Sequence, residues 1–235
     1  MSKHTSRKLP TSIFVTTLIS VSATFNLQAA DGETILNEKC VQCHEIKKPG
    51  PDSLQELWQQ KGPNLSYAGN KYKQAWLEHW LIKPSRIRPA GMFYGNHIKP
   101  GEERDVVDAS SLSDHTKLVP DQAKAVASTL MKFKNKSELI KQGAYIPGNI
   151  SLSMGDLLFV KIRGCSSCHQ IEADYGGLSG PEVYTAASRL QEDYIVSFLK
   201  NPQAWSPKTF MPNYELNEKD IQKFVHYFRA LAGEK

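Results

Sequence analysis

The 235-residue sequence is poor in cysteine, and after residue 30 it contains no apolar run long enough to cross a bilayer. It also lacks a cluster of Lys or Arg interleaved with aromatic residues, so nothing predicts a nucleic-acid-binding surface. Its four cysteines do not indicate a small disulfide-stapled domain, because a chain of this length can bury a core of its own. What remains is a globular protein of moderately polar composition.

The N-terminus has the layout of an export signal. Lys3, Arg7 and Lys8 precede the uncharged, moderately apolar stretch of residues 13–27, and small residues end at Ala30. We expect a signal peptide over residues 1–30, export to the periplasm and no membrane span after cleavage. An uncleaved anchor is the alternative, although the stretch is richer in Ser and Thr than a spanning helix. Loss of three basic residues takes the net charge from +5 to +2.

All four cysteines belong to two copies of the pattern C-x-x-C-H. The copies, CVQCH and CSSCH, comprise Cys40, Cys43, His44, Cys165, Cys168 and His169. Zinc sites made of two CxxC pairs usually have the pairs roughly 15–20 residues apart, whereas 125 positions separate Cys40 from Cys165. C-x-x-C-H is the attachment pattern of c-type haem, in which two thiols form thioethers and the next imidazole faces the iron. Two covalently bound haem c groups are therefore predicted, with zinc or disulfide pairing as the alternative.

The two halves of the chain repeat each other around these motifs. Pro63 lies 17 positions before Trp80, and Pro181 lies 17 positions before Phe198. Four residues later each copy has another proline, and a methionine follows after eight or nine more, Met92 in the first copy and Met211 in the second. This repeat predicts two domains, over residues 31–135 and 151–235, joined by a linker at 136–150.

The spacing of apolar residues predicts an all-α fold. We expect short helices over residues 31–40 and 153–165, leading into the cysteine pairs. A helix with an apolar stripe follows each Gly-Pro turn and is ended by Pro84 or Pro202. Closing helices are expected over residues 120–133 and 217–231, and no segment alternates convincingly as a strand.

This order of motifs resembles class I cytochromes c, small all-helical monohaem proteins, present twice in tandem as in dihaem periplasmic cytochromes c. The resemblance covers nearly the whole chain after residue 30. It implies that His44 and His169 are the proximal ligands of the two iron atoms. It further implies that Met92 and Met211 are the distal ligands, because haem iron in such cytochromes takes Met opposite His.

The resemblance also implies that the carbonyl groups of Pro63 and Pro181 steady the proximal imidazoles. The first half departs from the family pattern, because no proline follows Met92. His97, five residues later in a loop, is the rival ligand, whereas His79 is expected to be a partly exposed helix residue. The extra residues between Met92 and the closing helix are expected to form a surface loop that could contact a partner.

Iron held by His and Met has no open position for a substrate, so the resemblance implies a one-electron carrier that is not itself an enzyme. We expect redox protein partners: a dehydrogenase or quinol-oxidising complex as donor, and a terminal oxidase or reductase as acceptor. One alternative is the cytochrome subunit of a larger oxidoreductase. Another is a peroxidase-like haem enzyme with an open first haem. A thiosulfate-oxidising cytochrome would need a cysteine as distal ligand, and the sequence has no fifth cysteine.

Overall fold

A computed structural model describes Met1 and residues 31–233, and this part of the chain is mostly helical, with 45% helix against 5% strand. The predicted predominance of helix is thus confirmed. Apart from Met1, the expected signal peptide lies outside the described residues. No helix among the described residues is both long and apolar enough to span a membrane.

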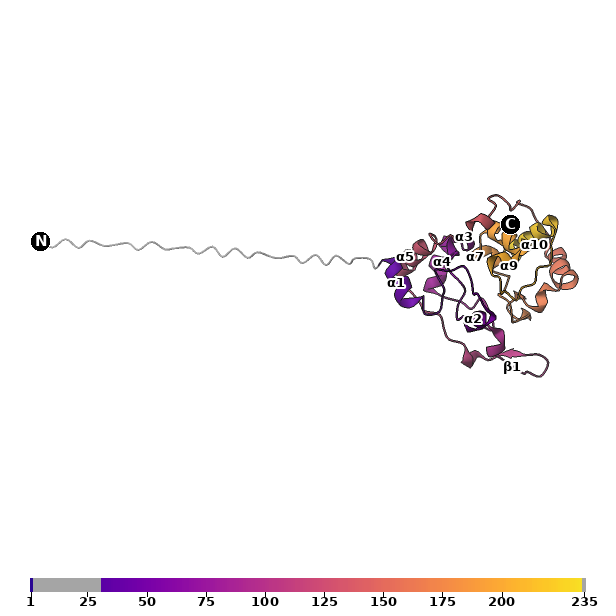
Figure 1. The fold of residues 1–235 in the computed structure, drawn as a ribbon, viewed down its shortest axis with the longest axis horizontal. Helices are drawn as coiled ribbons and strands as arrows, with labels where there is room; N and C mark the ends of the chain where they lie inside the picture. Colours follow the sequence, from indigo (N-terminus) through magenta and orange to yellow (C-terminus); the bar gives the residue numbers. More distant parts are fainter. Residues whose placement is uncertain (2–30, 234–235) are drawn as a thin grey trace.

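The helices follow one another in two similar series (Figure 1). The first series comprises α1 (Gly32–Lys39), α2 (Leu54–Gln59), α3 (Ala68–Lys71), α4 (Gln74–Ile82) and α5 (Pro120–Leu130). The second comprises α6 (Leu152–Asp156), which continues as a π-helix over Leu157–Ile162, then α7 (Ala186–Arg189), α8 (Glu192–Lys200), α9 (Pro202–Trp205) and α10 (Glu218–Leu231). Short 3₁₀ turns lie at Tyr94–Asn96, Ala109–Ser111, Ser137–Leu139 and Cys165–Ser167.

Two short antiparallel hairpins were not expected from the sequence. One pairs β1 (Ile98–Lys99) with β2 (Val106–Val107), and the other pairs β3 (Gln170–Glu172) with β4 (Tyr175–Gly176). Strands of two or three residues are too short to produce a recognisable alternation of apolar and polar positions. The expectation that no segment forms a strand is therefore wrong, but the helical framework is unchanged.

The helix boundaries follow from local sequence. Helix α10 begins after Asn217, whose side chain accepts a hydrogen bond from the backbone N–H of Asp220. The C-cap residues of helices α4 and α8 are Lys83 and Asn201, each directly before a proline, as predicted. The expected apolar face of α10 is buried, and it consists of Ile221, Phe224, Val225 and Phe228.

Each half has its own buried core. Helices α1, α4 and α5 pack together, and the residues they bury include Ile35, Leu36, Leu77, Leu81, Val126 and Leu130. In the second half α10 packs against α6, α7 and α8, and the π-helix adds Leu158 and Phe159 to the same core. A third cluster of Tyr67, Tyr194 and Trp205 joins the two.

The two halves meet at equivalent positions of the repeat. Tyr72 and Leu190 form an antiparallel bridge, and they are separated by 118 positions, as are Pro63 and Pro181. The N–H of Lys73 donates to the carbonyl of Arg189 (3.0 Å), while residues 191 and 71 make the reciprocal bond (2.9 Å). Figure 1 shows α3 and α7 where the indigo-to-magenta half meets the orange-to-yellow half. The two copies of the repeat are thus related by a local two-fold axis at this bridge.

The segment predicted as a linker is held by the second half. The ammonium group of Lys136 donates to the carbonyl oxygens of Ala204 (2.6 Å) and Trp205 (3.0 Å). Further along, the carboxylate of Asp193 accepts from the backbone N–H groups of Gly143 and Tyr145, both at 2.8 Å. The connection therefore runs along the surface of the second half and is fixed to it.

Candidate functional site

The two C-x-x-C-H motifs adopt the same backbone turn. Cys40 is the C-cap of helix α1, and the N–H of His44 donates to the Cys40 carbonyl at 3.0 Å. In the second copy the N–H of His169 donates to the Cys165 carbonyl at 3.1 Å. In each half the histidine thus lies one helical turn beyond the first cysteine of its motif.

Both histidines are held by the carbonyl groups named in the sequence analysis. Nδ1 of His44 donates to the carbonyl oxygen of Pro63 (2.8 Å), and Nδ1 of His169 donates to that of Pro181 (2.6 Å). Because a carbonyl can only accept, the proton lies on Nδ1, and the Nε2 lone pair is left available to a metal. Burial lowers the pKa of both imidazoles, which favours the neutral form that ligates.

A glycine lies against each of these rings. A Cβ atom at Gly62 would lie 2.5 Å from Cε1 of His44, and one at Gly180 would lie 2.7 Å from the His169 ring and 2.9 Å from the Cys168 carbonyl oxygen. Any side chain at either position would displace the imidazole. In each Gly-Pro pair the proline carbonyl therefore accepts the hydrogen bond of the imidazole, and the glycine leaves room for the ring.

The cysteines are free thiols, and one of each pair is half-buried. Cys40 and Cys165 pack against the cores of their respective halves, whereas Cys43 and Cys168 are exposed. Burial raises the pKa of the Cys40 thiol and raises that of Cys165 to about 11. Among residues 31–233 no group of three or more His, Cys, Asp or Glu side chains is placed to hold a metal ion. In each half the candidate donors are thus two thiols and one imidazole.

The Gly-Pro turns are supported differently in the two halves. In the first half the amide oxygen of Asn64 accepts from the N–H and hydroxyl of Ser66, at 2.8 and 2.7 Å. At the equivalent position of the second half Glu182 is 2% exposed and forms an ion pair with Arg189, which is 4% exposed. The turn that carries the Pro181 carbonyl therefore depends on a buried pair of charges.

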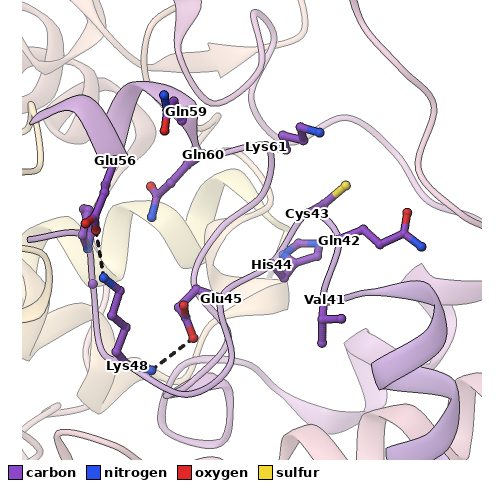
Figure 2. A pocket seen from close by; sticks show the side chains of 12 residues that line it. Val41, Gln42, Cys43, His44, Glu45, Lys48, Glu56, Gln59, Gln60 and Lys61 are labelled. Carbon is purple, nitrogen blue, oxygen red and sulfur yellow. Dashed lines mark hydrogen bonds and ion pairs between the residues drawn. The ribbon is translucent and has the colours of Figure 1, made fainter. Parts of the chain in front are cut away.

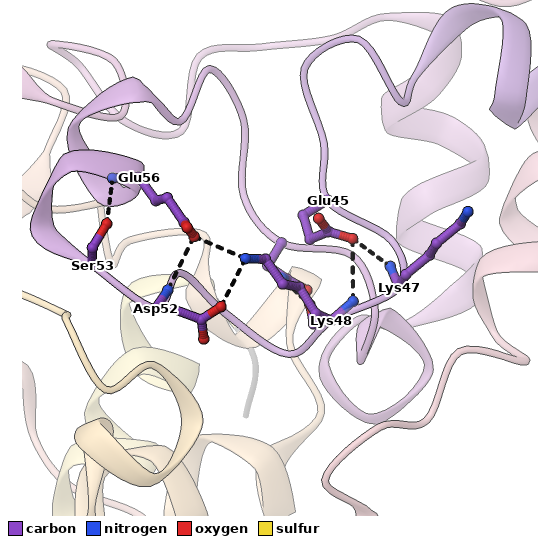
Figure 3. A network of polar contacts seen from close by, with 7 residues as sticks. Glu45, Lys47, Lys48, Asp52, Ser53 and Glu56 are labelled. Carbon is purple, nitrogen blue, oxygen red and sulfur yellow. Dashed lines mark hydrogen bonds and ion pairs between the residues drawn. The ribbon is translucent and has the colours of Figure 1, made fainter.

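Residues 45–61 connect the first motif to Gly62 and lie beside that motif. This segment forms one wall of an open pocket of about 270 Å³, and Figure 2 shows Cys43 and His44 at one side of it with Lys48 and Glu56 at the other. The ammonium of Lys48 contacts Asp52 (3.0 Å) and Glu56 (2.8 Å), and Ser53 caps helix α2 (Figure 3). This exposed polar network lies in a segment that is seven residues longer than its counterpart in the second half.

Met211 lies on the loop that faces the second motif. Its side chain packs against the same core as Cys165, and its carbonyl accepts from the side chain of Gln203 at 2.8 Å. Three residues later Tyr214 has its pKa raised, first by burial and then by the charges of Cys165 and Cys168. The structure therefore brings this expected ligand loop to the cysteine pair.

Met92 occupies a different environment. It is half-buried, but within residues 31–233 it is not among the side chains packed against the first core. Its neighbour Phe93 contacts Trp58 and, across the boundary between the halves, Phe210, with ring centres 6.0 and 6.1 Å apart. His97, the rival ligand, has Nδ1 bonded to the Ser111 hydroxyl at 2.8 Å.

A histidine that the sequence analysis did not consider lies beside His44. The ring centre of His115 is 6.1 Å from that of His44 and 4.6 Å from that of Trp80. His79, by contrast, is exposed on α4, with Nδ1 bonded to the Ala75 carbonyl, in agreement with its expected role as a surface residue. In the sequence, only its position shortly before the closing helix could have indicated His115.

The residues present fit a covalently attached haem in each half. The two free thiols and the neutral imidazole with an available Nε2 are the donors that c-type attachment needs. The carbonyl bond and the glycine fix the ring orientation. No protein-family model, no curated protein and no solved structure matches this chain.

Proposed function

We propose that this protein is a dihaem c-type cytochrome that carries single electrons between redox proteins, and that its two halves are tandem class I cytochrome c domains. The observation that carries the proposal is the repeated proximal arrangement: C-x-x-C-H, then an imidazole whose Nδ1 donates to the carbonyl of the Gly-Pro turn. A disulfide or zinc function would not require this histidine geometry twice.

The chain's own residues have distinct parts in this function. The cysteine pairs hold the group covalently, His44 and His169 ligate its iron, and the carbonyl groups of Pro63 and Pro181 keep each imidazole in the ligating tautomer. When bound, haem supplies reversible one-electron chemistry. In the second half Met211 is the proposed distal ligand, and in the first half the repeat indicates Met92.

The proposed location is the periplasm, because the expected signal peptide and thioether attachment both belong to an exported protein. The proposed partners are a donor such as a dehydrogenase or quinol-oxidising complex and an acceptor such as a terminal oxidase or reductase. The longer segment of residues 45–61, with its exposed Lys48, Asp52 and Glu56, is a candidate contact surface for one of them.

A redox titration of the purified exported protein tests the carrier function. We expect two one-electron steps, both fully reversible, and no binding of carbon monoxide by the reduced protein, because each iron has two protein ligands. Peroxide should be turned over negligibly. An iron that is high-spin at rest, together with peroxide turnover that is lost when Cys40 and Cys43 are replaced, would instead make the first half an enzyme site.

A further inference from the structure

His115 lies beside the imidazole proposed as the first proximal ligand. Nδ1 of His115 donates to the carbonyl of Thr116 at 2.8 Å, just as Nδ1 of His44 donates to the carbonyl of Pro63. Both rings therefore keep Nε2 free, and the planes of the two rings are inclined by 63°. Two neutral imidazoles with available nitrogen atoms are thus brought together from segments 71 positions apart.

The separation of the two rings suits a shared metal ion. With metal–nitrogen bonds of about 2.0–2.1 Å, two imidazoles on opposite sides of one ion have ring centres roughly 6.3 Å apart. The observed distance between the ring centres of His44 and His115 is 6.1 Å. The two rings thus lie at the separation that ligation of one iron from two sides requires.

The segment that carries His115 is fixed in place. The N–H of Leu118 donates to the carbonyl of Leu81 at 3.0 Å, which ties the segment to the end of α4. The His115 ring stands edge-on to Trp80, whose indole N–H donates to the Ser85 carbonyl at 3.1 Å. Trp80 in turn stacks on Trp76, with ring centres 5.5 Å apart. This support orients the imidazole before any ligand binds.

The position of His115 along the chain is also close to that of Met211. Met211 lies six residues before Asn217, the N-cap of closing helix α10. His115 lies four residues before Val119, the N-cap of closing helix α5, whereas Met92 lies 27 residues before it. Counted from the closing helix, His115 lies within two residues of the place of the second-half methionine, and the β1–β2 hairpin separates it from Met92.

We propose that His115, in place of Met92 or His97, is the sixth ligand of the first haem iron, so that the protein combines a His/His haem with a His/Met haem. This assignment rests on the proposed function. Met is the ligand that raises haem potential in cytochromes. The first haem should therefore have the lower potential, and an electron that enters at the first half should pass on to the second.

The test uses the full-length haem-loaded protein and near-infrared magnetic circular dichroism, which distinguishes His/His from His/Met iron. The wild-type protein should show the sulfur-to-iron charge-transfer band of one haem only, and Met211→Ala should abolish it. Met92→Ala and His97→Ala should leave the spectrum unchanged. His115→Ala should allow the reduced protein to bind one carbon monoxide per chain, and His79→Ala serves as the matched control that should bind none.

A second variant keeps the test decisive if His115→Ala fails to fold. His115→Met should keep the first haem low-spin and double the intensity of the charge-transfer band. The assignment is overturned if Met92→Ala halves the wild-type band, or if His97→Ala opens the first iron to carbon monoxide while His115→Ala does not. A protein without covalent haem would defeat the proposed function as well, whereas two covalent haems with either of those outcomes would defeat the His115 assignment alone.

Discussion

The two halves share one proximal arrangement and differ in what surrounds it. In both, an imidazole after the cysteine pair donates to the carbonyl of a Gly-Pro turn. In the first half that turn is supported by the neutral Asn64, and in the second half it is supported by the buried Glu182–Arg189 pair. The first half also has seven more residues before its Gly-Pro turn and a longer segment between Met92 and its closing helix. The duplicated part thus coincides with the proposed chemistry, while the supporting structure has diverged.

The largest expected effect comes from removing one attachment site at a time. Replacing Cys40 and Cys43 with Ala should remove one of two haems and leave the second half folded, because each half has a separate core. The matched variant at Cys165 and Cys168 should remove the other haem. Haem content per chain and the circular dichroism spectrum measure both effects. Loss of both haems from either variant would show that the halves are not independent.

The buried ion pair should contribute to the stability of the second half. Glu182→Gln leaves the charge of Arg189 buried without its partner, which should cost about 3–5 kcal/mol of unfolding free energy. The conservative control is Glu218→Gln, since the exposed Glu218–Lys200 pair should contribute within about 0.5 kcal/mol. Urea unfolding monitored by haem absorbance measures the difference. Equal midpoints for the two variants would contradict the structural role of the pair.

The glycines at the proximal rings should show a smaller, graded effect. Gly180→Ala places a Cβ against both the His169 ring and the Cys168 carbonyl oxygen, whereas Gly62→Ala meets only the His44 ring. We expect each variant to lose about 1–3 kcal/mol, with the larger loss at Gly180, because backbone moves less readily than a side chain. Thermal unfolding of the haem-loaded variants is the measurement. Gly143→Ala is a poor control because its φ is +69°, so Gly95→Ala, whose nearest side-chain contact is at 3.5 Å, is preferred.

The smallest effect concerns pH. The hydrogen bond from Arg163 lowers the pKa of Asp220, so this contact contributes stability above the unfolded carboxyl pKa of about 3.9 and loses it as the pH falls through the folded value. Because the pair is partly solvated, Asp220→Asn should cost about 1 kcal/mol or less at pH 7. The difference between wild type and variant should shrink towards pH 3 in urea unfolding. A difference that grows on acidification would have the wrong sign.

Much of the framework could be predicted from the sequence because it is locally encoded. The proline stops of α4 and α8 and the apolar face of α10 each depend on a few neighbouring residues. The hairpins and the Glu182–Arg189 pair could not be predicted in this way. The hairpins are too short to give a pattern, and Glu182 and Arg189 look like ordinary surface charges until the fold buries them.

The distal side of the first half has a different candidate ligand according to how the repeat is counted. Counting forward from Pro84 reaches Met92, which the β1–β2 hairpin separates from α5. Counting back from the closing helix reaches a position two residues from His115. Only the fold shows which of the two side chains lies beside His44, because that proximity is made by the packing of α4 against the segment before α5.

The intact mass of the purified exported protein, measured after acid-acetone extraction, tests the central claim most directly. The account predicts a chain that has lost its signal peptide near Ala30 and carries the mass of two haems, because thioether bonds at both cysteine pairs survive extraction. A mass equal to the polypeptide alone, or to the polypeptide with a single haem, would contradict a haem site in each half.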